Sequence, residues 1–89
     1  MRRVWIVLNL LVKCDVLHQK IDGERYVAWW PSERAAMPEV FPGVQAIEVP
    51  YDHLLILARR NGYEGVVRYD GKKLQVSPLE AIDLATHVR

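Results

Sequence analysis

The chain has 89 residues, of which 51% are apolar and 26% charged, and its formal net charge is +1. That length holds one domain with one small core, and the apolar fraction is too high for a disordered chain. A charge this close to neutral argues against a dedicated nucleic-acid or membrane-surface binder, which usually carries a large basic excess. We predict a single domain over residues 1–89. Its one cysteine, Cys14, leaves no internal disulfide, which suits the reducing cytoplasm.

An apolar run at residues 4–12 follows the basic start Arg2-Arg3. It is rich in β-branched and aromatic residues, and its continuous apolarity predicts a strand over residues 4–13 that is covered on both faces. The run is less than half of the roughly 20 residues that span a bilayer as a helix, so we predict no membrane contact. A basic start before an apolar run also fits a signal peptide, which is the minor alternative.

Two Asp-Gly pairs predict β-hairpins, because the favoured two-residue hairpin turn needs positive φ at both positions. The pairs are Asp22-Gly23 and Asp70-Gly71. The predicted strands are residues 16–21 and 25–30 around the first pair, and residues 65–69 and 72–76 around the second.

Three helices are predicted to start at a side chain that can cap the first turn. The capping residues are Ser32, Asp52 and Ser77, and Pro78 follows Ser77 at the favoured first helical position. The helices are residues 31–37, residues 51–60 and a C-terminal helix from Ser77-Pro78, and an alternating strand lies at residues 44–49.

The predicted order of elements is therefore β-β-β-α-β-α-β-β-α. Strands that alternate with helices in this way predict an α+β fold, with a mixed sheet of about five strands and three helices. The strand that begins at Val4 is expected at the centre of the sheet, where residues 4–12 help to nucleate the core.

Three pieces of the chain combine a strand with the start of a helix. They are residues 28–36 (AWWPSERAA), residues 47–55 (IEVPYDHLL), and residues 65–67 (GVV) with residues 76–82 (VSPLEAI). In these pieces the chain resembles the N-terminal domain family named after the secretion protein SseB, over residues 26–85, about two thirds of its length. The family often has an Asn-Pro-Gly loop where this chain has residues 68–71 (RYDG). The resemblance, which extends to small bacterial domains of unknown function, implies a small α+β fold and no catalytic residues.

The sequence predicts no catalytic residue, no metal site and no cofactor. His18, His53 and His87 lack the paired spacing of metal ligands, and no glycine-rich phosphate loop is present. Asp52-His53 is the only adjacent acid and imidazole, and neighbours on a helix point about 100° apart, so the two side chains do not face each other. A small enzyme centred on His53, with Asp52 or Glu48, is the third functional hypothesis.

The adjacent tryptophans Trp29 and Trp30 are the strongest partner-binding candidates. Neighbours on a strand point to opposite faces, so both rings are buried only if both faces are covered. We expect at least one ring in the core, and an exposed one would anchor a partner. The leading hypothesis is a non-enzymatic binding or assembly module with Trp29, Trp30 and Tyr51 as surface anchors. A sheet edge could also pair with another chain, and the expected partner is a second copy in a homodimer, or another protein.

A local basic patch is the alternative, and it would make the chain a weak nucleic-acid-associated module. If the fold brought the basic residues together, they would bind phosphates, with Tyr63 or Tyr69 as stacking partners. The near-neutral net charge favours a solvated rim instead. The residues of this predicted patch are Arg59, Arg60, Arg68, Lys72 and Lys73.

Overall fold

The computed structural model describes residues 2–13, 15–71 and 73–82. Its elements are, in chain order, β1 (Arg3–Asn9), β2 (Asp15–Val16), β3 (His18–Ile21), β4 (Glu24–Trp29), α1 (Glu33–Ala36), the 3₁₀ helix η1 (Met37–Glu39), β5 (Val44–Pro50), α2 (Tyr51–Arg60), β6 (Gly65–Asp70) and β7 (Lys73–Pro78). Residues 79–82 begin a further helix. Because β3 continues β2 and η1 continues α1, the predicted α+β fold and its order of elements are confirmed.

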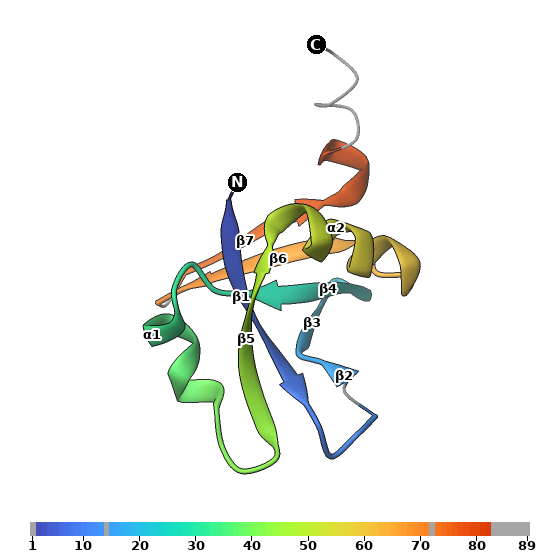
Figure 1. Cartoon of the computed structure of the whole chain (residues 1–89). Coiled ribbons are helices and arrows are strands. Elements are labelled where there is room, and N and C mark those ends of the chain that lie inside the picture. The colour runs from blue at the N-terminus through green and yellow to red at the C-terminus, as the bar shows by residue number, and fades with distance from the viewer. Residues whose placement is uncertain (1, 14, 72, 83–89) are drawn as a thin grey trace.

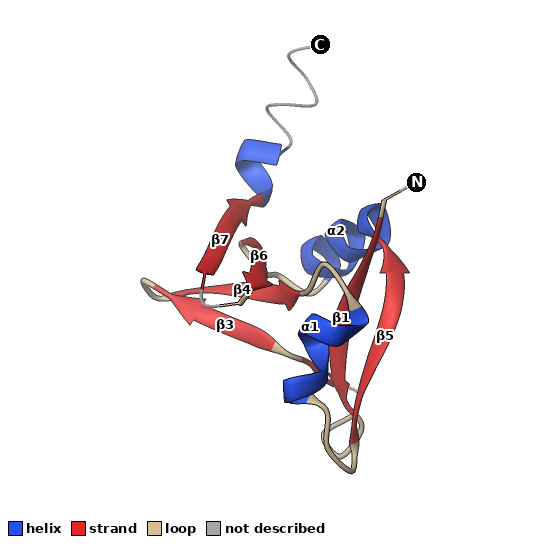
Figure 2. Cartoon of the chain, turned by 90° about the vertical axis from the view of Figure 1, so that its left-hand side faces the viewer, coloured by secondary structure: helices blue, strands red, loops and turns tan. Residues whose placement is uncertain are grey.

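The strands form two sheets where one mixed sheet was expected. One sheet has the order β2-β1-β5 and is antiparallel, and the other has the order β3-β4-β6-β7, with β4 and β6 parallel. The strands of the two sheets cross at a steep angle (Figures 1 and 2). Leu17, between β2 and β3, joins them, because its N–H donates to Val7 O at 2.8 Å and its carbonyl accepts from Ala28 N at 3.0 Å.

The crossing of the sheets produces two apolar clusters, one on each side of β1 and β4. The first cluster includes the inner face of α2, and the second includes α1. Both faces of β1 are covered, as the sequence predicted, and the same holds for β4. The buried members of the first cluster are Val4, Ile6, Val16, Val27, Trp29, Leu54, Ala58, Tyr63, Val66 and Leu79, and those of the second are Val7, Ala28, Trp30, Ala36, Val44 and Val67.

The strand predicted over residues 4–13 ends early, at Asn9. The Asn9 side chain accepts a hydrogen bond from Leu11 N at 3.0 Å, which starts a turn, and Lys13 has a φ of 48° within it. Residues 10–12 are exposed in this turn. The prediction of shielded extended backbone beyond Asn9 was wrong, because a polar side chain with local hydrogen-bonding capacity interrupted the apolar run.

The first predicted hairpin turn is confirmed. Asp22 and Gly23 have φ of 52° and 84°, as a type I′ turn requires. The second hairpin is also present, but β6 extends through Asp70, so its connection begins one residue later than predicted, at Gly71.

One of the three predicted caps is present. Ser32 accepts a hydrogen bond from Ala35 N at 3.2 Å. Asp52 lies inside the first turn of α2, where Pro50 occupies the capping position. Ser77 belongs to β7, which runs through Pro78 before the next helix begins at Leu79. Both cap predictions failed because a proline ends the preceding strand, Pro50 before α2 and Pro78 before the last helix.

Helix α2 supplies a direct test of this packing. Leu54 is fully buried in the first cluster, whereas Ile56 on the same helix is 45% exposed. We expect Leu54→Ala to lower the free energy of unfolding by about 2–5 kcal/mol, because it removes buried methyl groups and leaves a cavity. Ile56→Ala, the matched control, should change it by less than about 1 kcal/mol. Urea unfolding followed by circular dichroism measures both, and equal losses would contradict the packing described.

Candidate functional site

Both predicted tryptophan anchors are buried, at 5% exposure for Trp29 and 3% for Trp30. Trp29 lies in the first cluster and Trp30 in the second, where reciprocal backbone hydrogen bonds of 2.8 and 2.9 Å link Trp30 to Trp5. The prediction that they form surface anchors was wrong, because both faces of β4 are covered. Tyr51 is half-buried, with its ring edge-on to Trp29 at 5.7 Å between centroids.

Arginines cover this aromatic pair on its open side. The Arg2 guanidinium lies 4.9 Å from the centroid of the Trp29 ring and 4.7 Å from that of Tyr51. The Arg68 guanidinium lies 5.6 Å from the Trp29 ring and bonds Asp70 at 3.1 Å. These contacts hold the arginines against aromatic faces and make the pair part of the packed structure.

The predicted basic patch is not brought together. Arg68 lies beside Trp29, which contacts the first residue of α2, whereas Arg59 and Arg60 end that ten-residue helix. At 1.5 Å per residue, the two ends are roughly 13 Å apart. Lys73 pairs across the hairpin with Asp70, and Lys72 lies outside the described residues.

The two predicted stacking tyrosines are also engaged. Tyr69 packs on Trp30 at 5.2 Å between ring centroids, and its hydroxyl donates to Gln19 Oε1 at 2.6 Å. Tyr63 is buried beside His18. Neither ring offers the open face that base stacking needs.

His53 is exposed on the first turn of α2, and in the described ranges no residue hydrogen bonds to it. Those ranges also contain no group of three side chains that could hold a metal ion. None of their helices is long and apolar enough to cross a membrane. In the part of the chain that the structure describes, the Glu48 carboxylate pairs with Arg3 at 2.6 Å, and no hydrogen bond links His53 to Asp52 or Glu48.

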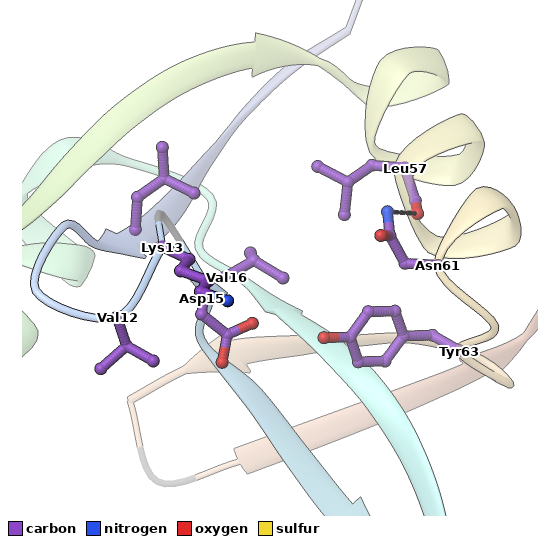
Figure 3. Close-up of a pocket in the computed structure, with 8 residues that line it drawn as sticks. Val12, Lys13, Asp15, Val16, Leu57, Asn61 and Tyr63 are labelled. Carbon is purple, nitrogen blue, oxygen red and sulfur yellow. Dashed lines mark hydrogen bonds between the residues drawn. The ribbon is translucent and has the colours of Figure 1, made fainter.

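A cavity of about 370 Å³ lies between the β1–β2 turn and the last turn of α2 (Figure 3). Apolar side chains form part of its wall, and four polar side chains face the same space. The lining residues are Leu8, Val12, Val16 and Leu57, with Lys13, Asp15, Asn61 and Tyr63 as the polar members. Sequence reasoning missed this site, because its residues come from two distant stretches of the chain, residues 8–16 and 57–63, and no spacing connects them.

Tyr63 is the most buried polar residue of the cavity, at 8% exposure. The Arg25 guanidinium covers its ring at 4.7 Å, and the His18 ring packs against it at 5.4 Å. Its hydroxyl points across the cavity toward Asp15 (Figure 3), and no described residue hydrogen bonds to it. Burial, and secondly the Asp15 charge, raise the pKa of Tyr63 above its ordinary value of 10.0, although Arg25 opposes them.

Among the described residues, strand β7 has a sheet neighbour only on one side, β6, so it forms an open edge of the four-stranded sheet. Pro78 pairs with Gly65 and has no N–H, so this is a non-hydrogen-bonded pair, and Leu79 N donates to Glu64 O at 2.8 Å just beyond it. Because hydrogen-bonded and non-hydrogen-bonded pairs alternate along an antiparallel ladder, Val76 and Leu74 are also in non-hydrogen-bonded pairs. Their backbone N–H and C=O groups therefore point away from β6.

The side chains at this edge are unusually apolar. Leu74 and Val76 are 48% and 38% exposed, and within the described strands no other large apolar residue is exposed. Their cross-strand partners, Tyr69 and Val67, belong to the second cluster. The pair therefore extends a buried apolar face to the open edge, and we call Leu74 and Val76 the β7 edge.

Comparisons with known proteins gave no match, either to a protein-family model or to a curated protein. The SseB resemblance thus stays a prediction, and the functional argument depends on the two features described above, the cavity and the β7 edge.

The raised pKa of Tyr63 predicts a pH effect on stability. Below pH 10 the phenol is protonated in both the native and the unfolded state. Above it the unfolded state loses its proton first, so stability falls as the pH rises through the native pKa. We expect Tyr63→Phe to reduce the fall in unfolding free energy between pH 9 and pH 11. Urea titrations of both proteins at each pH measure it, and an unchanged fall would contradict this role of burial.

Proposed function

We propose that this protein is a non-enzymatic assembly module that self-associates, with a second copy of the chain bound along the β7 edge. The observation that carries the proposal is the row of outward backbone groups at Leu74 and Val76, flanked by exposed apolar side chains. Such an edge is a template for another strand. A cytoplasmic location belongs to the same proposal and is supported by the lone cysteine, Cys14.

The sequence of β7 is self-complementary in an antiparallel pair centred on Gln75. In that register Leu74 of one copy lies opposite Val76 of the other, so their outward N–H and C=O groups exchange four hydrogen bonds across the two-fold axis. The four apolar side chains then meet on one face, as favourable cross-strand pairs. Two four-stranded sheets would join into one continuous sheet.

Charge supports the same register. Lys73 of one copy lies opposite Ser77 of the other, so like charges are not placed in direct opposition. Pro78 follows, and its missing N–H limits the pairing to the residues before it. The interface is small, so the association is expected to be weak and dependent on concentration.

Proline at position 76 tests the edge without disturbing the monomer. The N–H of Val76 points away from β6, so Val76→Pro removes a bond only from the dimer. Light scattering is measured from about 10 μM to about 1 mM protein. The mass of the wild type should rise toward twice 10.3 kDa, and the variant should remain a monomer of 10.3 kDa. A wild type that is monomeric throughout would overturn self-association, and a dimeric Val76→Pro would overturn this interface.

Gln75→Pro is the matched control for backbone direction. The N–H of Gln75 points toward β6, so its loss leaves a ladder acceptor without its donor and should lower the unfolding free energy by about 1–3 kcal/mol, while Val76→Pro should cost much less. Thermal unfolding measures both. Equal losses would show that the assigned direction of the β7 backbone groups is wrong.

A mixing experiment tests the register itself. Leu74→Lys and Val76→Glu should each weaken the homodimer, whereas a mixture places the new lysine of one chain opposite the new glutamate of the other. We expect heterodimers in native mass spectrometry of the mixture. Leu74→Lys mixed with Ile56→Glu is the control, because Ile56 on α2 is exposed to a similar extent and lies outside the edge. Heterodimers in the control but not in the first mixture would reject the register.

A further inference from the structure

We propose that the cavity beside Tyr63 binds a small zwitterion with an aliphatic body, an α-amino acid of about the size of leucine. This binding site is independent of the β7 edge, which contributes none of the lining residues. Three features of the cavity support the assignment: an unpartnered hydroxyl on a largely buried tyrosine, opposite charges that are not paired with each other, and an aliphatic wall.

The hydroxyl of Tyr63 is the first feature. Tyr63 is 8% exposed, and its hydroxyl opens into the cavity with no hydrogen-bond partner among the described residues (Figure 3). The hydroxyl itself is not buried, because among the described residues the buried side-chain polar atom without a hydrogen-bond partner is Nε of Arg68. The hydroxyl of Tyr69, by contrast, bonds Gln19 at 2.6 Å. The Tyr63 hydroxyl is therefore available to a bound molecule.

The charges are the second feature. Lys13 and Asp15 line the same cavity, and neither forms an ion pair with another residue of the described ranges. Their charges cancel, so a ligand with only one charge would be repelled by one of them. A molecule that carries both an ammonium and a carboxylate complements both, and each contact would be a charge-assisted hydrogen bond.

Asn61 helps to determine which end of the ligand contacts which side chain. Its Nδ2 donates to Leu57 O at 2.7 Å, so its Oδ1 is left as an acceptor. Together with the Asp15 carboxylate and the Tyr63 oxygen, the cavity offers three acceptors to the three N–H donors of a primary ammonium. Lys13, in the exposed turn, is then left for the carboxylate.

The aliphatic wall and the volume set the remaining chemistry. Leu8, Val16 and Leu57 line the cavity beside the polar groups, so an aliphatic side chain would be shielded from water there. A volume of about 370 Å³ lies near the lower end of small-molecule sites, about 300–1,000 Å³. It suits a single amino acid better than a nucleotide.

A ligand series tests the assignment on the full chain. L-leucine is titrated into ¹⁵N-labelled protein, and three related compounds are titrated in parallel. L-leucinamide lacks the carboxylate, 4-methylpentanoate lacks the ammonium, and glycine lacks the aliphatic body. We expect L-leucine to shift the amide signals of Asp15, Asn61 and Tyr63, and to bind at least tenfold more tightly than the other three. No shift at about 10 mM L-leucine, or equal binding of any of the other three compounds, would overturn the proposal.

Matched variants locate the binding. Tyr63→Phe and Asp15→Asn should each weaken L-leucine binding about tenfold, the size of a lost hydrogen bond to a charged group. Tyr69→Phe and Asp22→Asn make the same chemical changes outside the cavity and should leave binding unchanged. Unaltered binding in both cavity variants would reject the site. Repeating the titration with Val76→Pro separates this result from self-association.

Discussion

The backbone junction between the two sheets is the constraint on which the rest of the structure depends. Trp5 and Trp30 exchange hydrogen bonds of 2.8 and 2.9 Å, and Leu17 bonds one sheet through its N–H and the other through its carbonyl. With the sheets fixed across each other, alternate side chains of β1 and β4 enter different apolar clusters. A chain of 89 residues thereby covers both faces of its two central strands, which one flat sheet with three short helices would not achieve.

In this arrangement most aromatic side chains pack inside the protein, while some hydrogen-bond donors and acceptors elsewhere have no partner among the described residues. Trp29, Trp30 and Tyr69 pack in the two clusters, and arginines cover the aromatic rings that reach the surface. Among the described residues, the outward backbone groups of β7 and the Tyr63 hydroxyl lack a hydrogen-bond partner. The case for binding rests on these two places because their donors and acceptors are available to a bound molecule.

Local rules predicted the elements well, and long-range packing decided the rest. The Asp22-Gly23 turn followed from turn chemistry, which involves only near neighbours. The helix at residues 51–60 was also found as predicted, although Asp52, its expected cap, lies inside the first turn. The burial of the adjacent tryptophans could not be predicted in this way, because it depends on whether a second sheet covers the outer face of β4. The cavity was out of reach for the same reason, since residues as distant as Leu8 and Tyr63 meet only after the sheets cross.

The short segment from Tyr63 to Gly65 fixes the geometry of both candidate binding features at once. Glu64 donates to Arg25 O and accepts from Leu79 N, each at 2.8 Å, so it is held between β4 and the end of β7. A Cβ at Gly65 would contact Ser77 O and lie 2.7 Å from Pro78 Cα, so only glycine permits this approach. Tyr63 enters the cavity from a backbone that has little freedom to move with respect to β7. A ligand in the cavity and a second chain on the edge would therefore meet surfaces that are already formed, without the ordering cost that weakens binding to flexible segments.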